Sequence, residues 1–340
     1  MANSPVVLGI DFGGTKIATA VCDTAGNKLA AAVVDSRGEE GARVSFDHGV
    51  RTARDVLAAA AAGSPLAAVG VSTFGIPFED RVELAPAIDG WESLALGREL
   101  RQAFPGAAIR MSTDAKAAAS AEVRWGALAG YDPALYLNLG TGLAAAIITS
   151  GQVLSGGNGA AGEIGYSLRE PGDGSPGSAD GLRVTLEDMV SGQALQRRAG
   201  LQGRRMTAAE VFAAAADDPG LDSLIADFAR ELAFHVVNLA IAVNPARNAV
   251  GGGLTRSWDR IGPRLQAALS LAPYPPELVL ARFPHEAPLL GAVALAVDAA
   301  TGIPPRRSAP VLNIPHPDGQ PGSVTTPDSA PTTTSIGNLS

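Results

Sequence analysis

The chain has very little cysteine: Cys22 is the only one among 340 residues. A lone thiol cannot form an internal disulfide, and it cannot supply a cysteine-rich zinc site. The four histidines are isolated in the sequence and show no metal-ligand spacing, at His48, His235, His285 and His316. This composition argues against a disulfide-stabilised secreted protein and predicts a reducing, cytoplasmic location.

Basic residues and long hydrophobic runs are also scarce. The chain has 26 Lys and Arg against 34 Asp and Glu, which gives a net charge of -8. Nucleic acids and anionic membranes attract proteins through clustered Lys and Arg. The longest apolar stretch, residues 232–250, is interrupted by Asn244, Pro245 and Arg247, and the N-terminus lacks the basic segment of a signal peptide. We therefore expect no nucleic-acid and no membrane partner, and a small-molecule ligand instead.

Glycine, by contrast, is abundant, and one informative cluster lies near the N-terminus. The apolar run Val6–Leu8 leads through Asp11 into Gly13 and Gly14, and a second strand is expected over residues 17–23. Without a Cβ, these glycines allow backbone amides to approach a phosphate-sized ligand. In a P-loop or a Rossmann turn the glycines open a helix, so a strand on both sides argues against both. The alternative interpretation is an ordinary glycine-rich hairpin corner.

The second half of the chain repeats this arrangement. Residues 136–148 predict a strand, a turn at Gly140-Thr141-Gly142 and a second strand, about 130 residues after the first corner, which indicates one copy per half. Two facing glycine corners could hold two parts of one polyphosphate. A third glycine run, Gly251–Gly253, ends a strand expected over residues 248–251.

The remaining pattern alternates expected strands and helices. A G-x-G-x-x-G match at Gly157, Gly159 and Gly162 follows no strand directly, so it predicts a substrate loop and not a dinucleotide site. Residues 170–180 predict a loop, and residues 307–340, rich in Pro, Ser and Thr, predict a disordered tail. Strands are expected over 66–72 and 108–111, and helices over 50–62, 96–104, 114–127, 186–198, 208–216, 221–243 and 288–302.

Taken together in their order and spacing, several short motifs resemble the ROK family of sugar kinases, within the actin-like ATPase group that includes hexokinases. The resemblance covers nearly everything from residue 6 to residue 302. The motifs are Asp11–Lys16, Pro86-x-x-x-Gly90-Trp91, Asp114-Ala115, Gly140–Gly142, Gly162–Gly165, Leu186-Glu187-x-x-x-Ser191-Gly192, Asn244-Pro245 and Gly251–Gly253.

The resemblance implies an α/β fold with two ribonuclease-H-like lobes around a central cleft. The N-terminal lobe would span residues 1–112 and be completed by the helix at 288–302, and the C-terminal lobe would span 113–287. The implied activity is ATP-dependent phosphorylation of a hexose or amino-sugar hydroxyl, with the 6-hydroxyl expected and with Mg²⁺ as cofactor. A homodimer is plausible on the same resemblance.

The resemblance also implies roles for individual residues. Asp114 would be the general base, although Asp is equally a common helix N-cap. Asp11 would hold Mg²⁺ through water. Glu187 could instead be a first-turn carboxylate that the helix dipole favours. The side chains of Lys16 and Lys116 are expected to be solvated. The triphosphate would lie along Gly13, Gly14, Thr15, Lys16, Gly140, Thr141 and Gly142, the nucleoside along Gly252 and Gly253, and the sugar against Thr113, Asp114, Asn158, Glu163, Tyr166 and Glu187.

The chain departs from the family pattern in its sugar site. Tyr166 replaces a histidine that in many members also binds a structural zinc with three cysteines, and since no cysteine follows, we predict no zinc. Thr113, Lys116 and Ala87 stand where asparagines are common, which argues against a plain glucose specificity.

Three other functions are compatible with this resemblance to different degrees. A sugar-binding protein of the same fold with weak or lost catalysis, and a polyphosphate-using glucokinase, both stay open. A sugar-sensing DNA-binding repressor is disfavoured, because such members carry a helix-turn-helix segment before the first corner and only ten residues precede Asp11 here.

Overall fold

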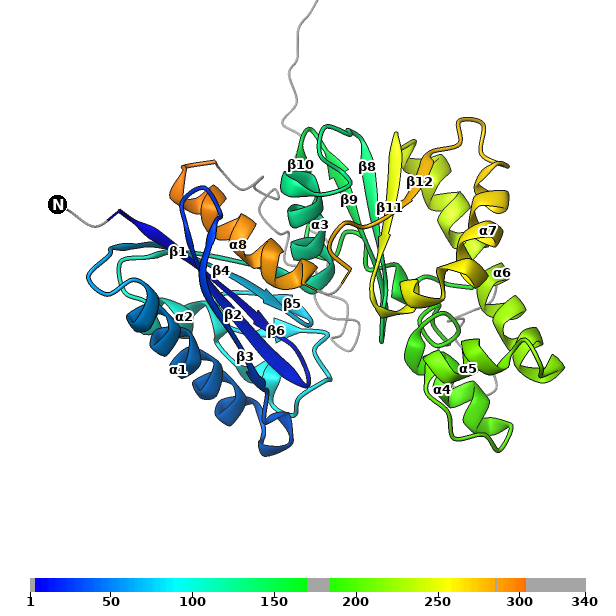
Figure 1. The fold of residues 1–340 in the computed structure, drawn as a ribbon, viewed down its shortest axis with the longest axis horizontal. Helices are drawn as coiled ribbons and strands as arrows, with labels where there is room; N and C mark the ends of the chain where they lie inside the picture. Colours follow the sequence, from blue (N-terminus) through cyan, green and yellow to red (C-terminus); the bar gives the residue numbers. More distant parts are fainter. Residues whose placement is uncertain (1–3, 170–183, 285, 304–340) are drawn as a thin grey trace, which may run out of the picture.

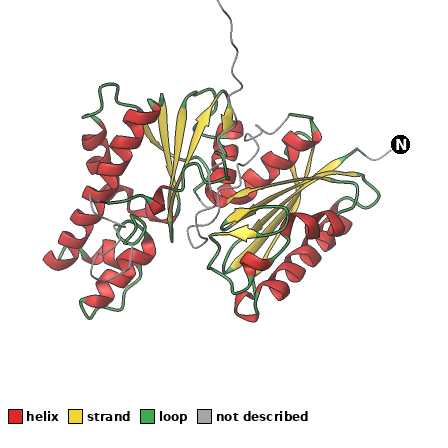
Figure 2. Cartoon of the chain, turned by 180° about the vertical axis from the view of Figure 1, so that it is seen from behind, coloured by secondary structure: helices red, strands yellow, loops and turns green. Residues whose placement is uncertain are grey.

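The computed structural model describes residues 4–169, 184–284 and 286–303. Within them the chain forms two five-stranded mixed sheets with helices packed on their faces (Figure 1), which confirms the predicted α/β class. Figure 2 shows the same two sheets from behind. The loop expected at 170–180 and the tail expected at 307–340 lie outside the described residues.

The first sheet has the strand order β3-β2-β1-β4-β7. The pairs β1–β2 and β2–β3 are antiparallel, whereas β1–β4 and β4–β7 are parallel. Helices α1 (Ala42–Ala60) and α2 (Leu96–Ala103) bury Phe46 and Leu100 in the core on one face of this sheet. The strands are β1 (Val6–Phe12), β2 (Lys16–Asp23), β3 (Lys28–Asp35), β4 (Leu66–Thr73) and β7 (Ala108–Thr113), and the short strands β5 (Ile76–Pro77) and β6 (Val82–Glu83) form a separate pair.

The second sheet repeats the first with the order β10-β9-β8-β11-β12. Again the first three strands are antiparallel neighbours and the last two are parallel additions. The internal repeat that the sequence predicts for one hairpin therefore extends to a whole sheet. The strands are β8 (Ala134–Leu139), β9 (Leu143–Thr149), β10 (Gln152–Val153), β11 (Arg247–Gly251) and β12 (Glu277–Leu280).

Four helices pack into one core with the second sheet: α4 (Gly192–Leu201), α5 (Ala208–Ala214), α6 (Pro219–Val243) and α7 (Trp258–Leu269). Helix α6 has clear end signals: Asp218 accepts from the backbone N–H groups of Gly220 and Leu221, and Asn244 ends the helix in the left-handed region. In the part of the chain that is described, no helix combines the length and apolar surface needed to cross a bilayer.

Helices α3 (Asp114–Trp125) and α8 (Ala287–Ala300) lie between the two sheets (Figure 1). Two glycines allow the close packing of α8. A Cβ on Gly70 of β4 would lie 1.8 Å from the Ala292 carbonyl oxygen, and one on Gly291 would lie 1.8 Å from that of Ala117 in α3. Helix α8 therefore contacts β4 on one side and α3 on the other at backbone distance, which fixes the helix that begins at Asp114.

Two helix boundaries differ from those expected. The helix expected over 50–62 begins at Ala42, directly after Gly41 with φ 92. The helix expected over 186–198 begins only at Gly192, where the Ser191 hydroxyl accepts from the Ala194 N–H at 2.9 Å. Glu187 thus precedes the helix and is no first-turn carboxylate, so the helix dipole is not the reason for its position.

Candidate active site

The first glycine corner lies where β1 ends. The Gly13 N–H donates to the Lys16 carbonyl at 2.9 Å, which closes the turn. Ser36, buried at the end of β3, fixes the corner from behind: its hydroxyl donates to the Gly14 carbonyl at 2.8 Å and its N–H donates to that of Thr15 at 3.0 Å. Thr15 and the side chain of Lys16 are exposed. The structure thus presents a fixed turn with an open outer side.

The second corner lies at the equivalent place in the second sheet. The Gly140 N–H donates to the Gly142 carbonyl at 3.0 Å. The first N–H groups of α4 hold it from behind, since Gly192 donates to the Gly140 carbonyl at 2.9 Å and Gln193 to that of Thr141 at 3.1 Å. These donors of the α4 N-terminus are therefore occupied by the turn itself.

The third glycine run packs on the second corner. Gly252 has φ 90, and a Cβ there would lie 2.3 Å from the Leu139 carbonyl oxygen, so glycine is required on both counts. Gly253 is exposed, and a Cβ on it would meet nothing within 4 Å. The two predicted nucleotide segments of the second half are thus neighbours, with free space beside Gly253.

Asp114 lies at the junction between β7 and α3. The helix cap is Thr113, whose side chain accepts from the Lys116 N–H, whereas Asp114 accepts only from the adjacent Ala115 N–H, at 2.7 Å. Burial, and then the charges of Glu163 and Glu187, raise the Asp114 pKa to about 6 against the lowering effects of the Ala115 N–H and Lys116. Thr113 therefore caps the helix, and the carboxylate of Asp114 is not needed for capping.

Asp11 lies close to Asp114, from the neighbouring part of the same sheet. Its strand partner across β1 and β4 is Ser72, whose hydroxyl lowers the Asp11 pKa. Burial, the larger effect, together with the charge of Asp114 raises that pKa to about 7. Two half-buried carboxylates thus share one region with no basic side chain at ion-pair distance among the described residues.

Lys116 is not solvated as expected. Its side chain is 4% exposed, and its ammonium donates to the Glu163 carboxylate at 2.6 Å, with Thr113 Oγ1 at 3.5 Å. Isolated burial of an ammonium is costly, so this position depends on the pairing with Glu163. The pair links α3 to the loop that contains the Gly162–Gly165 motif, and it positions one of the predicted sugar acceptors.

The other predicted sugar residues lie in different surroundings. Glu187 Oε2 accepts from the Leu143 N–H at 2.7 Å, next to Gly142 of the second corner. Tyr166 is 44% exposed. Burial and the negative charges of Glu187 and Glu163 raise the pKa of its phenol, so Tyr166 lies near these two carboxylates. Asn158 is exposed on the loop after β10, and the side chain of Lys16 is exposed at the first corner. We call Asp114, Glu163, Glu187 and Lys116 the sugar-site cluster.

Two residues of the site were not predicted from the sequence. Ser36 and Ser72 lie on β-strands or their ends, far along the chain from the corners that they contact, at Gly14 and Asp11. The prediction for a third, Lys116, was wrong: it is the one charged residue in the run Ala115–Ala119, and nothing in that run indicates its partner Glu163.

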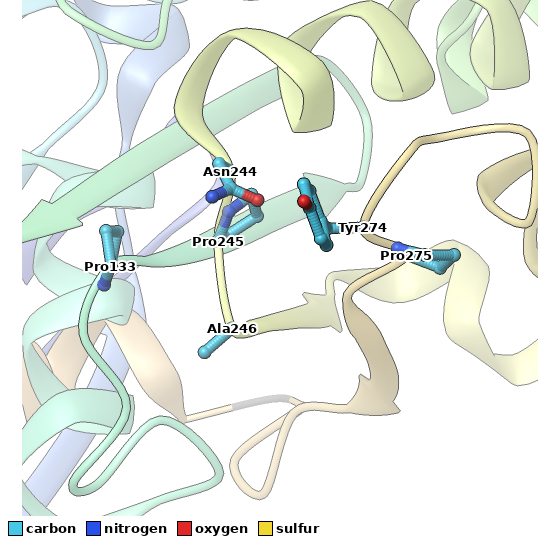
Figure 3. A pocket seen from close by; sticks show the side chains of 6 residues that line it. All are labelled: Pro133, Asn244, Pro245, Ala246, Tyr274 and Pro275. Carbon is cyan, nitrogen blue, oxygen red and sulfur yellow. The ribbon is translucent and has the colours of Figure 1, made fainter.

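A hollow of about 350 Å³ lies elsewhere, at the opposite end of the second sheet (Figure 3). Its lining residues Pro133, Ala246 and Pro275 come just before β8, β11 and β12. In mixed and parallel sheets, ligands bind at the carboxyl ends of the parallel strands. The carboxyl ends are where Asp11, Asp114 and the glycine corners lie, so the hollow is not part of this site.

Comparison with known proteins fits this geometry. The model of the ROK family matches residues 7–299. The kanosamine kinase of Amycolatopsis mediterranei (strain S699) is 31% identical over 318 residues, which cover 88% of this chain and 98% of that protein.

Solved structures agree. The ROK hexokinase from Thermus thermophilus superposes with a TM-score of 0.73 at 30% identity, over 87% of this chain and 100% of the other. A ROK family glucokinase from Streptomyces griseus, solved with glucose and AMPPNP, superposes with a TM-score of 0.66 at 28% identity, over 85% and 98%. The predicted fold and the predicted class of sugar kinase are confirmed at this level, and the chain belongs to the ROK family.

Proposed function

We propose that this protein transfers the γ-phosphoryl group of ATP to the 6-hydroxyl of a hexose or an amino sugar, with Asp114 as the general base. The observation that carries the proposal is the position of Asp114. It is half-buried at the end of β7, it is free of the capping role, and its pKa is raised to about 6, in reach of both the sugar-site cluster and Asp11. A carboxylate with that pKa is ionised at neutral pH and basic enough to accept a proton.

The chemistry follows from these placements. Asp114 takes the proton of the sugar hydroxyl while the oxygen forms a bond to the γ-phosphorus, and the bond from that phosphorus to the ADP oxygen breaks. The products are a sugar phosphate and ADP. The Gly13 and Gly140 N–H groups close their own turns, so the remaining amides of the two corners, those of Gly14, Thr15, Thr141 and Gly142, would donate to the triphosphate.

The surroundings of Asp11 suit a magnesium ion. Burial and, to a smaller extent, the charge of Asp114 raise the Asp11 pKa, and a cation beside the carboxylate would offset both effects. Mg²⁺ is bound by one or two carboxylates, waters and substrate phosphates, which makes Asp11 its holder, through water. When bound, the ion neutralises charge on the triphosphate. The chain itself aligns Asp11 through the strand pairing with Ser72.

The sugar-site cluster favours a substrate with an amine. It holds three carboxylates, Asp114, Glu163 and Glu187, against the single ammonium of Lys116. An ammonium group on the sugar would reduce this excess of negative charge, and a neutral sugar would not. Similarity to a protein named kanosamine kinase agrees with an amino sugar. Tyr166 supplies a hydroxyl where the family has an imidazole, which changes the donor geometry for the sugar.

The decisive experiment measures ADP release with Mg-ATP across a panel of hexoses, amino sugars and N-acetylated amino sugars. Wild type is compared with Asp114→Ala, and with Asp55→Asn on the exposed face of α1 as a matched control. NMR of the product identifies the phosphorylated hydroxyl. Turnover of an amino sugar above glucose supports the proposal. A panel without turnover, or a loss below about tenfold in Asp114→Ala, overturns the assignment of the base.

Further measurements test the predictions on the phosphoryl donor, on catalysis, on zinc and on the homodimer. Replacing ATP by polyphosphate separates the two phosphoryl donors, and sugar binding without turnover would identify a binding protein. In the described residues no three His, Cys, Asp or Glu side chains are grouped to hold a metal ion. Metal analysis of the purified protein tests the prediction of no zinc, and light scattering tests the predicted homodimer.

A further inference from the structure

A cavity of about 450 Å³ lies between the two sheets, apart from Asp114, Glu163 and Glu187. Residues of β7 and β10 line it, and these are the edge strands of the two sheets. Helices α3 and α8 supply the rest of the wall. The cavity therefore touches both halves of the molecule, and a ligand in it would contact both.

The charged groups of the cavity leave an excess of positive charge. Arg124 pairs with Asp298 at 2.6 Å, and Lys116 pairs with Glu163. Arg110, from the edge strand β7, donates to the Ile303 carbonyl, and no carboxylate of the described residues lies at ion-pair distance from it. Its partial burial lowers its pKa, although a guanidinium stays charged at neutral pH. Asp298 thus offsets the charge of Arg124 and, at longer range, part of that of Arg110, and the described wall keeps an excess of positive charge.

Hydroxyl groups lie beside these charges. Ser112 of β7, Ser120 of α3 and Ser155 after β10 line the same cavity. The Ser120 hydroxyl donates to the Lys116 carbonyl at 3.0 Å, which leaves its oxygen able to accept. Guanidinium groups match the planar oxygen edges of phosphate, and serine hydroxyls match the alternating donors and acceptors of a polyol.

We propose that this cavity is a second binding site for a phosphate dianion, either as inorganic phosphate or as the phosphate of a phosphorylated sugar. Arg110 is the main anion contact, with Arg124 beside it, and the three serines bind the rest of a sugar phosphate. The site also regulates the proposed kinase, and this part rests on the proposed function.

Lys116 connects the cavity to the sugar-site cluster. Its side chain lines the cavity, and its ammonium holds Glu163 at 2.6 Å. An anion in the cavity attracts the same ammonium and weakens its hold on Glu163. Since Glu163 is a proposed sugar contact, occupancy of the cavity raises the KM for the sugar and leaves the ATP corners unchanged.

Calorimetric titration of the full chain tests the binding site without any need for activity. The probes are inorganic phosphate, glucose 6-phosphate and, as the neutral control, glucose, all in the presence of saturating Mg-AMPPNP. We expect binding of a phosphate probe to wild type and a loss of about tenfold or more in affinity for Arg110→Ala. Binding of glucose 6-phosphate tighter than phosphate assigns a sugar phosphate as the ligand; equal binding assigns free phosphate.

Two variants separate the cavity from other effects. Among the described residues that line the cavity Asp298 is the only acidic one, so Asp298→Asn should tighten binding of the phosphate probe, whereas a general loss of fold would weaken it. Arg264→Ala, an exposed arginine of α7, is the matched control and should bind as wild type does. Equal affinity in wild type and Arg110→Ala, or weaker binding in Asp298→Asn, overturns the site.

The regulatory part is tested by kinetics on a sugar that turns over. We expect the phosphate probe to raise the sugar KM several-fold in wild type and not in Arg110→Ala. In the absence of the probe, the two enzymes should have the same kcat. An equal effect in both enzymes would contradict the regulation. If no sugar turns over while Arg110-dependent binding is present, the proposed function fails and the cavity site remains.

Discussion

The two glycine corners occupy equivalent places in sheets of the same strand order, yet they differ in charge. β1 brings Asp11 to the first corner, and β8 brings the neutral Asn138 to the second. Phe12 pairs with Ile17 across the first corner and Leu139 with Leu143 across the second, so the second turn is shorter by one residue. Similar backbones therefore present different chemistry at the same position.

The difference extends to the neighbouring strands. In the first sheet, β7 leads into Asp114, and both carboxylates have raised pKa values, about 7 and about 6. In the second sheet, β11, which is the counterpart of β4 in strand order, leads into Gly252, where a Cβ would lie 2.8 Å from the Asn138 side-chain oxygen. One repeat thus concentrates negative charge for a cation and a proton acceptor, and the other offers uncharged backbone and amide groups. The two sheets share one backbone arrangement, and the residues at the strand ends give each sheet a different chemical role.

The largest expected effect comes from removing the base of the charged repeat. Asp114→Asn should lower kcat/KM about 10²- to 10⁴-fold, because the sugar hydroxyl loses its proton acceptor. Steady-state kinetics against Asp55→Asn on α1 measure it. A loss shared by the control, or a loss below about tenfold, would show that the charge at position 114 does not act as a base.

The same variant should be more stable than wild type near pH 7.5. The folded-state pKa of Asp114 is raised above its usual 3.8, so the folded protein binds this proton more tightly, and stability is lost as pH rises from about 4 through about 6. Asparagine removes that cost, on the order of 2 kcal/mol. Thermal melting of both proteins measures this difference. A melting temperature of the variant that is higher near pH 7.5 and equal to that of wild type near pH 4 shows that the loss of activity is not caused by misfolding.

Converting the first corner to the chemistry of the second should have the next largest effect. Asp11→Asn gives β1 the amide that β8 already has, and we expect kcat to fall on the order of 100-fold, with a higher Mg²⁺ concentration needed for half-maximal rate. Initial rates over a Mg²⁺ series at fixed ATP measure both. An unchanged Mg²⁺ requirement would mean that Asp11 does not hold the ion, and that the charge difference between the corners has another purpose.

The parts of this arrangement that the sequence predicted are local. A strand that runs into a turn with two glycines identifies each corner without knowledge of the rest. Its repetition predicted one such hairpin in each half, whereas the two lobes were implied by the resemblance to the ROK family. Gly49 shows why one boundary was missed: it lies inside α1, where a Cβ would come within 2.5 Å of the Phe12 ring. A glycine normally weakens a helix, so the pattern before it looked like a loop. Its presence reflects packing against β1, which a local pattern does not contain.

The prediction for Lys116 was wrong for a related reason. Its position is determined by Glu163, 47 residues later on another segment, together with burial between α3 and the sheets. Ser36 contacts Gly14 across 22 residues of sequence, and Ser72 reaches Asp11 from the neighbouring strand β4. Side chains that meet through tertiary packing leave no periodic trace, and a charge in an alanine-rich helix can be placed only when its partner is known.

The pH dependence of kcat/KM should report on the charged repeat, with a change of about tenfold. With saturating Mg²⁺, Asp114 is the group of the charged repeat that must lose its proton, so kcat/KM should fall about tenfold from pH 7 to pH 5, with an inflection near 6. The negative charge of Glu187 contributes to that raised pKa, and Glu187→Gln should move the inflection to lower pH. An acid limb that stays below pH 5 in wild type would contradict the raised pKa of Asp114.

The smallest expected effect comes from the opposite exchange. Asn138→Asp gives the second corner the carboxylate of the first, close to Gly140 and Gly252, where the proposal puts the triphosphate. Repulsion between this charge and the phosphates should raise the KM for ATP several-fold, while kcat and the Mg²⁺ requirement change little, because Asp11 remains. Asn248→Asp is unsuitable as a control because Asn248 is buried, so Asn238→Asp on the exposed face of α6 serves instead. If Asn138→Asp leaves the KM for ATP unchanged, the second corner does not face the phosphates; if it rescues Asp11→Asn, the two corners are interchangeable and the division of charge between the repeats carries no function.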